Sequence, residues 1–105
     1  MKYTQSEIIE IITPIMVNYP VLRGAIFGSY ARNEQLENSS DLDLLLELGV
    51  DDNHTCVDYV YEMLDIIESK TKLHVDFITT KALKANPSIR FRESIEKDCR
   101  WFYEI

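Results

Sequence analysis

The chain has 105 residues, of which 46% are hydrophobic, and its formal net charge is −7. This length suits one domain with a continuous apolar core, and we expect no second folded domain. The negative charge argues against direct nucleic-acid binding, because that binding needs clustered Lys and Arg to neutralise phosphates.

A helix and then a strand are predicted at the start of the chain. Residues Thr4 to Glu7 match the capping-box pattern, and apolar residues then recur at helical spacing to about Asn18. The helix is expected to end there because the residue before Pro20 avoids helical geometry. Residues 21–27 are apolar enough to form a strand that is mostly buried.

A turn and a second strand follow. Gly28 and Ser29 are expected to close the first strand with a turn, and residues 30–35 to form one or two helical turns. After a polar loop, residues 41–48 are apolar enough for a central strand, although two aspartates stand at its beginning.

The second half of the chain predicts a helix, a strand, a helix and a final strand. Residues 55–69 have one apolar stripe, and residues 73–78 form a short apolar run. Asn86 followed by Pro87 predicts a helix start, and the aromatic tail at 100–105 predicts an edge strand. The expected fold is α/β (or α+β), a small mixed β-sheet flanked by helices.

Three aspartates are the candidate metal ligands. Asp41 and Asp43 are two residues apart on a predicted strand, so their side chains should point to the same face, about 6–7 Å apart at the Cα atoms. Asp76 lies in the third predicted strand between apolar neighbours, where an unpaired carboxylate is costly. Repelling carboxylates are usually reconciled by a divalent cation, held together with substrate phosphates.

The spacing of these residues resembles a known signature. The runs at 28–33 (GSYARN) and 40–44 (SDLDL) resemble the motif of the DNA polymerase β superfamily of nucleotidyltransferases, and most closely that of its minimal (MNT) branch. The resemblance extends to the segments at 86–90 and 95–104, which are similar to the closing helix and tail of that branch. It implies one minimal nucleotidyltransferase domain over residues 1–105 with a polymerase-β-like fold.

The resemblance also implies an activity and a partner. Members of the MNT branch are usually encoded beside a HEPN-domain ribonuclease toxin and act as its antitoxin (MntA type), in characterised members by transferring AMP from ATP to the toxin. Two Mg²⁺ ions would clamp the triphosphate and activate the acceptor hydroxyl. The implied metal-binding and catalytic residues are Asp41, Asp43 and Asp76; the implied nucleotide-binding residues are Gly28, Ser29 and Arg32.

Two alternatives to this function stay open. One is a small-molecule nucleotidyltransferase similar to aminoglycoside-modifying enzymes, although those generally have a further helical domain. The other is an antitoxin that only masks its partner. Asn33 bears on the second, because it stands where the family usually has glycine; Asn tolerates left-handed geometry, so the turn is expected to survive.

The remaining candidates have simpler interpretations. His54 and His74 have no ligand-spaced partner, so neither is expected to act as a base or a metal ligand. Two lone cysteines are expected to be reduced, and neither a signal peptide nor a membrane span is predicted, which favours a cytoplasmic protein. Core positions are expected for most of the larger aromatic residues, with some free to face a partner or a second copy: Tyr59, Tyr61, Trp101, Phe102 and Tyr103.

Overall fold

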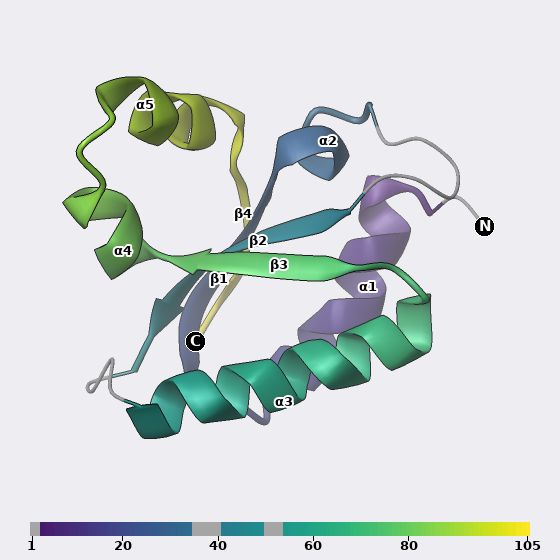
Figure 1. Cartoon of the computed structure of the whole chain (residues 1–105). Helices are drawn as coiled ribbons and strands as arrows, with labels where there is room; N and C mark the ends of the chain where they lie inside the picture. Colours follow the sequence, from purple (N-terminus) through teal and green to yellow (C-terminus); the bar gives the residue numbers. More distant parts are fainter. Residues whose placement is uncertain (1–2, 35–40, 50–53) are drawn as a thin grey trace.

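A computed structural model describes residues 3–34, 41–49 and 54–105, except for the side chains of residues 54–56. Four strands form one mixed sheet in the order β3-β2-β1-β4, where β2 and β3 are parallel and the other neighbours are antiparallel (Figure 1). The strands are β1 (Val21–Phe27), β2 (Leu42–Leu48), β3 (Val75–Thr79) and β4 (Arg100–Glu104). The predicted mixed sheet is confirmed, with the aromatic tail as an edge strand.

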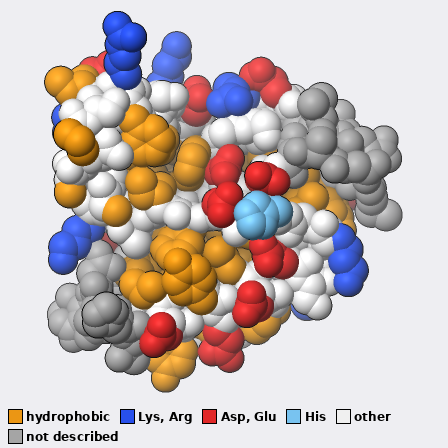
Figure 2. All heavy atoms as spheres, in the orientation of Figure 1, with side chains coloured by type: hydrophobic (Ala, Val, Ile, Leu, Met, Phe, Trp, Pro, Cys, Tyr) orange, Lys and Arg blue, Asp and Glu red, His pale blue; other side chains and the backbone are white. Residues whose placement is uncertain are grey.

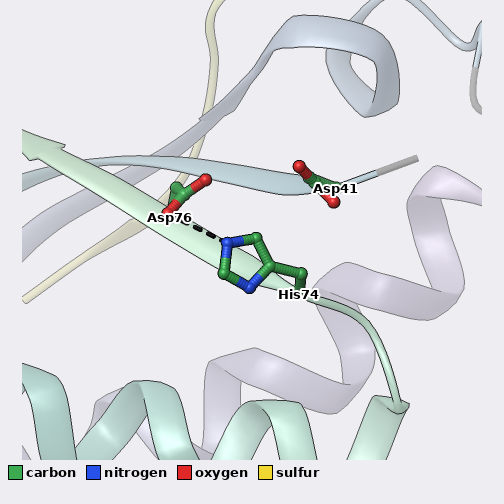
Figure 3. A group of neighbouring side chains, drawn as sticks. All are labelled: Asp41, His74 and Asp76. Carbon is green, nitrogen blue, oxygen red and sulfur yellow. Dashed lines mark ion pairs between the residues drawn. The ribbon is translucent and has the colours of Figure 1, made fainter. Parts of the chain in front are cut away.

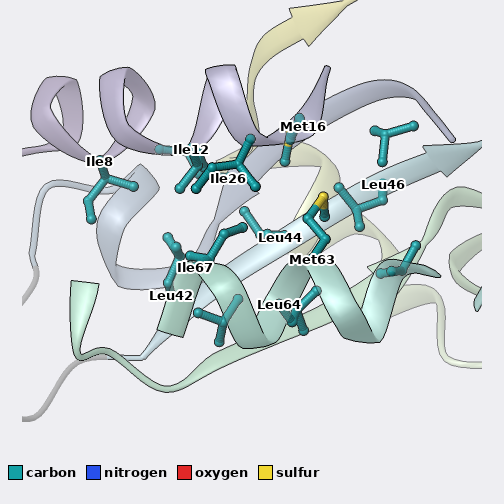
Figure 4. Close-up of a cluster of buried hydrophobic side chains, with 14 of the residues drawn as sticks. Ile8, Ile12, Met16, Ile26, Leu42, Leu44, Leu46, Met63, Leu64 and Ile67 are labelled. Atoms are coloured by element: carbon teal, nitrogen blue, oxygen red, sulfur yellow. The ribbon is translucent and has the colours of Figure 1, made fainter. Parts of the chain in front are cut away.

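Two long helices cover one face of the sheet, which we call the core face. They are α1 (Gln5–Met16) and α3 (His54–Thr71), which contact each other; in Figure 1 α3 runs below the strands and α1 stands to the right. The predicted capping box of α1 is formed: the Glu7 N–H donates to Thr4 Oγ1, and the Thr4 N–H donates to Glu7 Oε1. The side chains at the centre of this layer are fully buried (Figure 4), among them Ile8, Ile12, Met16, Leu44, Leu46, Met63 and Ile67.

Two short helices pack on part of the opposite face. These are α4 (Thr80–Ala85) and α5 (Ile89–Asp98), and their side chains Leu83 and Ile95 form a small buried cluster with residues of β1 and β2. Because side chains alternate along a strand, the same face of β2 carries Asp43. We call this the site face.

The structure corrects three local predictions. The helix α2 (Gly28–Ala31) begins at the glycine that was expected only to close a turn. The helix expected to start at Asn86 and Pro87 starts instead at Ile89, with Ser88 as its N-cap, because the Ser88 hydroxyl accepts from the Phe91 N–H. A short helix, α4, was not predicted at all.

Several aromatic residues expected in the core are on the surface. Tyr59, Tyr61 and Trp101 are 50%, 57% and 41% exposed, whereas Phe102 and Tyr103 are partly buried against the main core. The Tyr61 ring meets Phe77 edge-on, and Trp101 stacks on the Arg23 guanidinium; in these positions each aromatic buries only one side. In the described part of the chain, no helix is long and apolar enough to cross a membrane.

Candidate active site

Two parallel strands bring the predicted acids together. Asp43 on β2 is directly opposite Asp76 on β3. One step earlier, the Leu42 N–H donates to the His74 carbonyl at 2.9 Å, which sets Asp41 beside His74. The ligand atoms of Asp41, His74 and Asp76 all lie within 4.8 Å of one another, on exposed side chains (Figure 3). Among the described residues, this is the one group of three such side chains close enough to share a metal ion.

Asp43 lies behind this exposed group and feels its charge. Burial raises the pKa of the Asp43 carboxyl to about 6, and the Asp76 and Asp41 carboxylates add to the rise; the positive charges of Arg32 and His74 oppose it. The carboxylate is therefore short of favourable partners when ionised. A divalent cation would relieve this shortage, because it would add to the positive charge that the surrounding residues supply.

Gly28 allows the end of β1 to approach Asp43 closely. Its φ of +73° is a left-handed conformation, and a Cβ at this position would collide with Oδ2 of Asp43. Ser29, the next residue, is half-buried in the first turn of α2. The backbone turn and the carboxylate therefore border the same space, which is the arrangement that a ligand held by both would need.

Arg32 ties this turn to α5. Its Nε donates to Glu34 at 2.9 Å and its Nη1 donates to Asp98 at 2.9 Å. Asn33 follows with φ 60°, so the left-handed turn survives without glycine, as expected. The guanidinium charge acts on the Asp43 carboxyl, as its lowering of that pKa shows. A nucleotide contact by Arg32 stays a prediction.

His74, which was expected to have no ligand-spaced partner, lies on the surface close to two carboxylates. Its Nδ1 is 3.3 Å from Glu68 Oε2, and its Nε2 is 3.3 Å from Asp76 Oδ1. Figure 2 shows acidic side chains gathered around a histidine in the middle of the visible surface. One signal in the sequence could have placed it: His74 precedes Asp76 by two residues, the same spacing that puts Asp41 and Asp43 on one face.

Comparison with known proteins agrees with this geometry. The profile of the nucleotidyltransferase domain family matches residues 9–102. A relative from Methanocaldococcus jannaschii, described as a "putative protein adenylyltransferase", is 37% identical over 99 residues, which cover 90% of this chain and 94% of the relative.

Two solved structures share the fold at low sequence identity. A chain in the crystal structure of a toxin–antitoxin pair with AMP-PNP superposes with a TM-score of 0.68 at 16% identity, covering 92% of this chain and 73% of that one. A chain in the structure of a tri-AMPylated Shewanella oneidensis HEPN toxin in complex with MNT antitoxin gives a TM-score of 0.64 at 12% identity, covering 97% and 74%. The family profile and the M. jannaschii relative place this chain in the nucleotidyltransferase domain family.

Proposed function

We propose that this nucleotidyltransferase transfers AMP from ATP to a protein, and that the acceptor is a HEPN-domain toxin for which the chain acts as antitoxin. The observation that carries the proposal is the position of Asp43, which lies opposite Asp76, feels the charge of Asp41 and borders the tight turn at Gly28. The description of the M. jannaschii relative supports protein adenylylation. The AMP-PNP and the AMPylated HEPN toxin in the two structures of similar fold support ATP and a HEPN partner.

The carboxylates fit a site for magnesium. Mg²⁺ prefers carboxylate oxygens together with substrate phosphates, and such ions would be held by Asp41, Asp43 and Asp76. A side chain at position 28 would collide with the Asp43 carboxylate. Glycine at this position therefore keeps the space beside the carboxylate open. Bound metal would neutralise the triphosphate and lower the energy of the charged transition state.

The chain's own groups would position the nucleotide. The backbone N–H of Gly28 and the hydroxyl of Ser29 are suited to donate hydrogen bonds to phosphate oxygens, and Arg32 adds a positive charge that reaches Asp43. In the transfer itself, the acceptor hydroxyl would lose its proton to solvent, its oxygen would bond to the α-phosphorus, and the bond to pyrophosphate would break. Catalysis of this kind depends chiefly on positioning and charge stabilisation.

The test uses the HEPN protein expected beside this chain in its genome. The two proteins are incubated with ATP and Mg²⁺, the adduct is mapped by mass spectrometry, and the ribonuclease activity of the separated toxin is measured. We expect the toxin to gain AMP and lose activity. Neither should occur in EDTA or with Asp41→Asn combined with Asp43→Asn. A toxin that carries no nucleotide and regains full activity after separation would instead establish neutralisation by masking.

A further inference from the structure

His74 occupies a position equivalent to those of the aspartates. The parallel register aligns Leu42 with Val75 and Asp43 with Asp76, so one step earlier it aligns Asp41 with His74. The four side chains at 41, 43, 74 and 76 therefore form two neighbouring cross-strand pairs on the site face. Three of the four end in carboxylates, and the fourth presents an imidazole to the same space.

Glu68 lies against one ring nitrogen of His74, so the other ring nitrogen faces Asp76. This residue, near the end of α3, accepts the Val75 N–H through Oε2 at 2.8 Å, which fixes its carboxylate against the start of β3. The same oxygen lies 3.3 Å from Nδ1 of His74, and on the far side of the ring Nε2 lies 3.3 Å from Oδ1 of Asp76. Histidines that bind metals typically donate their second ring N–H to a carboxylate in this way.

The spacing of the ring nitrogen and the carboxylate suits two ligands of one ion. With Nδ1 of His74 against Glu68, its Nε2 faces an oxygen of Asp76. Two ligand atoms at right angles around an ion, each about 2.1 Å from it, lie about 3 Å apart. The observed separation of 3.3 Å between Nε2 and Oδ1 is close to this value.

We propose that His74 is a nitrogen ligand of the metal site, oriented by Glu68, and that it shifts the preference of the site towards first-row transition ions such as Mn²⁺. An imidazole nitrogen raises the affinity for first-row transition ions relative to Mg²⁺, which prefers oxygen ligands. Mn²⁺ is the weakest binder of that series and also accepts carboxylates well, so it gives the most demanding test of this preference. The inference rests on the proposed function only for the location of the ion. It concerns the ratio of the Mn²⁺ and Mg²⁺ affinities, because carboxylates alone also bind both ions.

The first experiment measures metal affinity without nucleotide or acceptor. Mn²⁺ and Mg²⁺ are titrated by calorimetry into the wild-type chain, His74→Ala and Glu68→Gln. The matched control is His54→Ala, which removes the chain's other histidine at the opposite end of α3. We expect His74→Ala to weaken Mn²⁺ binding about tenfold or more, Glu68→Gln to have a smaller effect in the same direction, and Mg²⁺ binding to change much less. Circular dichroism of each variant verifies that it is folded.

The second experiment detects the bond itself. In pulsed EPR, a directly bound imidazole nitrogen modulates the Mn²⁺ echo, so the wild type and His54→Ala should show this modulation and His74→Ala should not. If Mn²⁺ binds the wild type without nitrogen modulation, or if His74→Ala weakens both ions by the same factor, His74 is not a ligand, while the proposed transfer reaction stands. A wild-type chain that binds neither ion, even with ATP present, would overturn the proposed function as well.

Discussion

Replacement of Asp43 by Asn tests whether the site sacrifices stability for metal binding. The Asp43 carboxyl is half-buried, and burial together with the Asp76 and Asp41 carboxylates raises its pKa from 3.8 to about 6. The folded protein therefore holds this proton more tightly than the unfolded chain does. The free energy of unfolding should fall as the pH rises from about 4 through 6, because the carboxylate must ionise in an unfavourable place.

The size of this effect follows from the shift. A rise from 3.8 to about 6 corresponds to about 3 kcal/mol at 1.36 kcal/mol per unit. Because the group is half exposed, solvent screening reduces this to about 1–2 kcal/mol. We therefore expect Asp43→Asn to raise the free energy of unfolding by about 1–2 kcal/mol above pH 7 in the metal-free protein, and to make little difference near pH 4.

The assay is urea denaturation in EDTA at several pH values between these limits. Asp58→Asn, which removes an exposed carboxylate on α3, is the matched control and should leave the pH profile unchanged. Addition of Mg²⁺ should then stabilise the wild type and not Asp43→Asn, which would reverse their order. If Asp43→Asn instead lowers stability at neutral pH in EDTA, the carboxylate makes structural contacts and the electrostatic account of the site is wrong.

Three further substitutions test the fold around the site. Gly28→Ala should lower stability by about 1–3 kcal/mol and abolish Mg²⁺ binding, since its Cβ would displace Asp43; thermal melts and calorimetry would show this, and unchanged binding would contradict it. Leu44→Ala, at a position that is 0% exposed, should cost about 2–5 kcal/mol in urea denaturation; a loss below about 1 kcal/mol would mean that the core face is loosely packed. Thr4→Ala should lower the free energy of unfolding by about 0.5–2 kcal/mol in urea denaturation, and an unchanged value would mean that the capping box does not stabilise α1.

Local signals made the strands and the first helix predictable. The capping box at Thr4 and Glu7 lies within one turn, and β1 was placed with its exact bounds because the run from Val21 to Phe27 is bordered by a proline and a glycine. By contrast, α4 has only 6 residues, too few for helical periodicity to show. Its N-cap Thr79 is also the last residue of β3, so the same residue serves two elements.

The contact of His74 with Glu68 could not be predicted because it depends on how the chain turns between α3 and β3. Glu68 is on α3, and the chain reverses after that helix through Lys72, whose φ of 63° could not be read from the residue type. The start of α5 was misplaced for a local reason. The side chain of Asn86 accepts a hydrogen bond from the Ser88 N–H within the turn before the helix. The residue that caps the helix is Ser88.

The alternation of β2 and β3 explains how like charges can collect here without unfolding the chain. Leu42, Leu44 and Val75 point to the core face and are at most 3% exposed beneath α1 and α3. Fully burying one such side chain contributes about 1.5–3 kcal/mol, so each offsets a repulsion of about 1–2 kcal/mol on the site face. A shift of the register by one residue would bury the carboxylates and expose the leucines. Burial of Leu42, Leu44 and Val75 on the core face therefore sets the register of the two strands, and this register places Asp43 opposite Asp76.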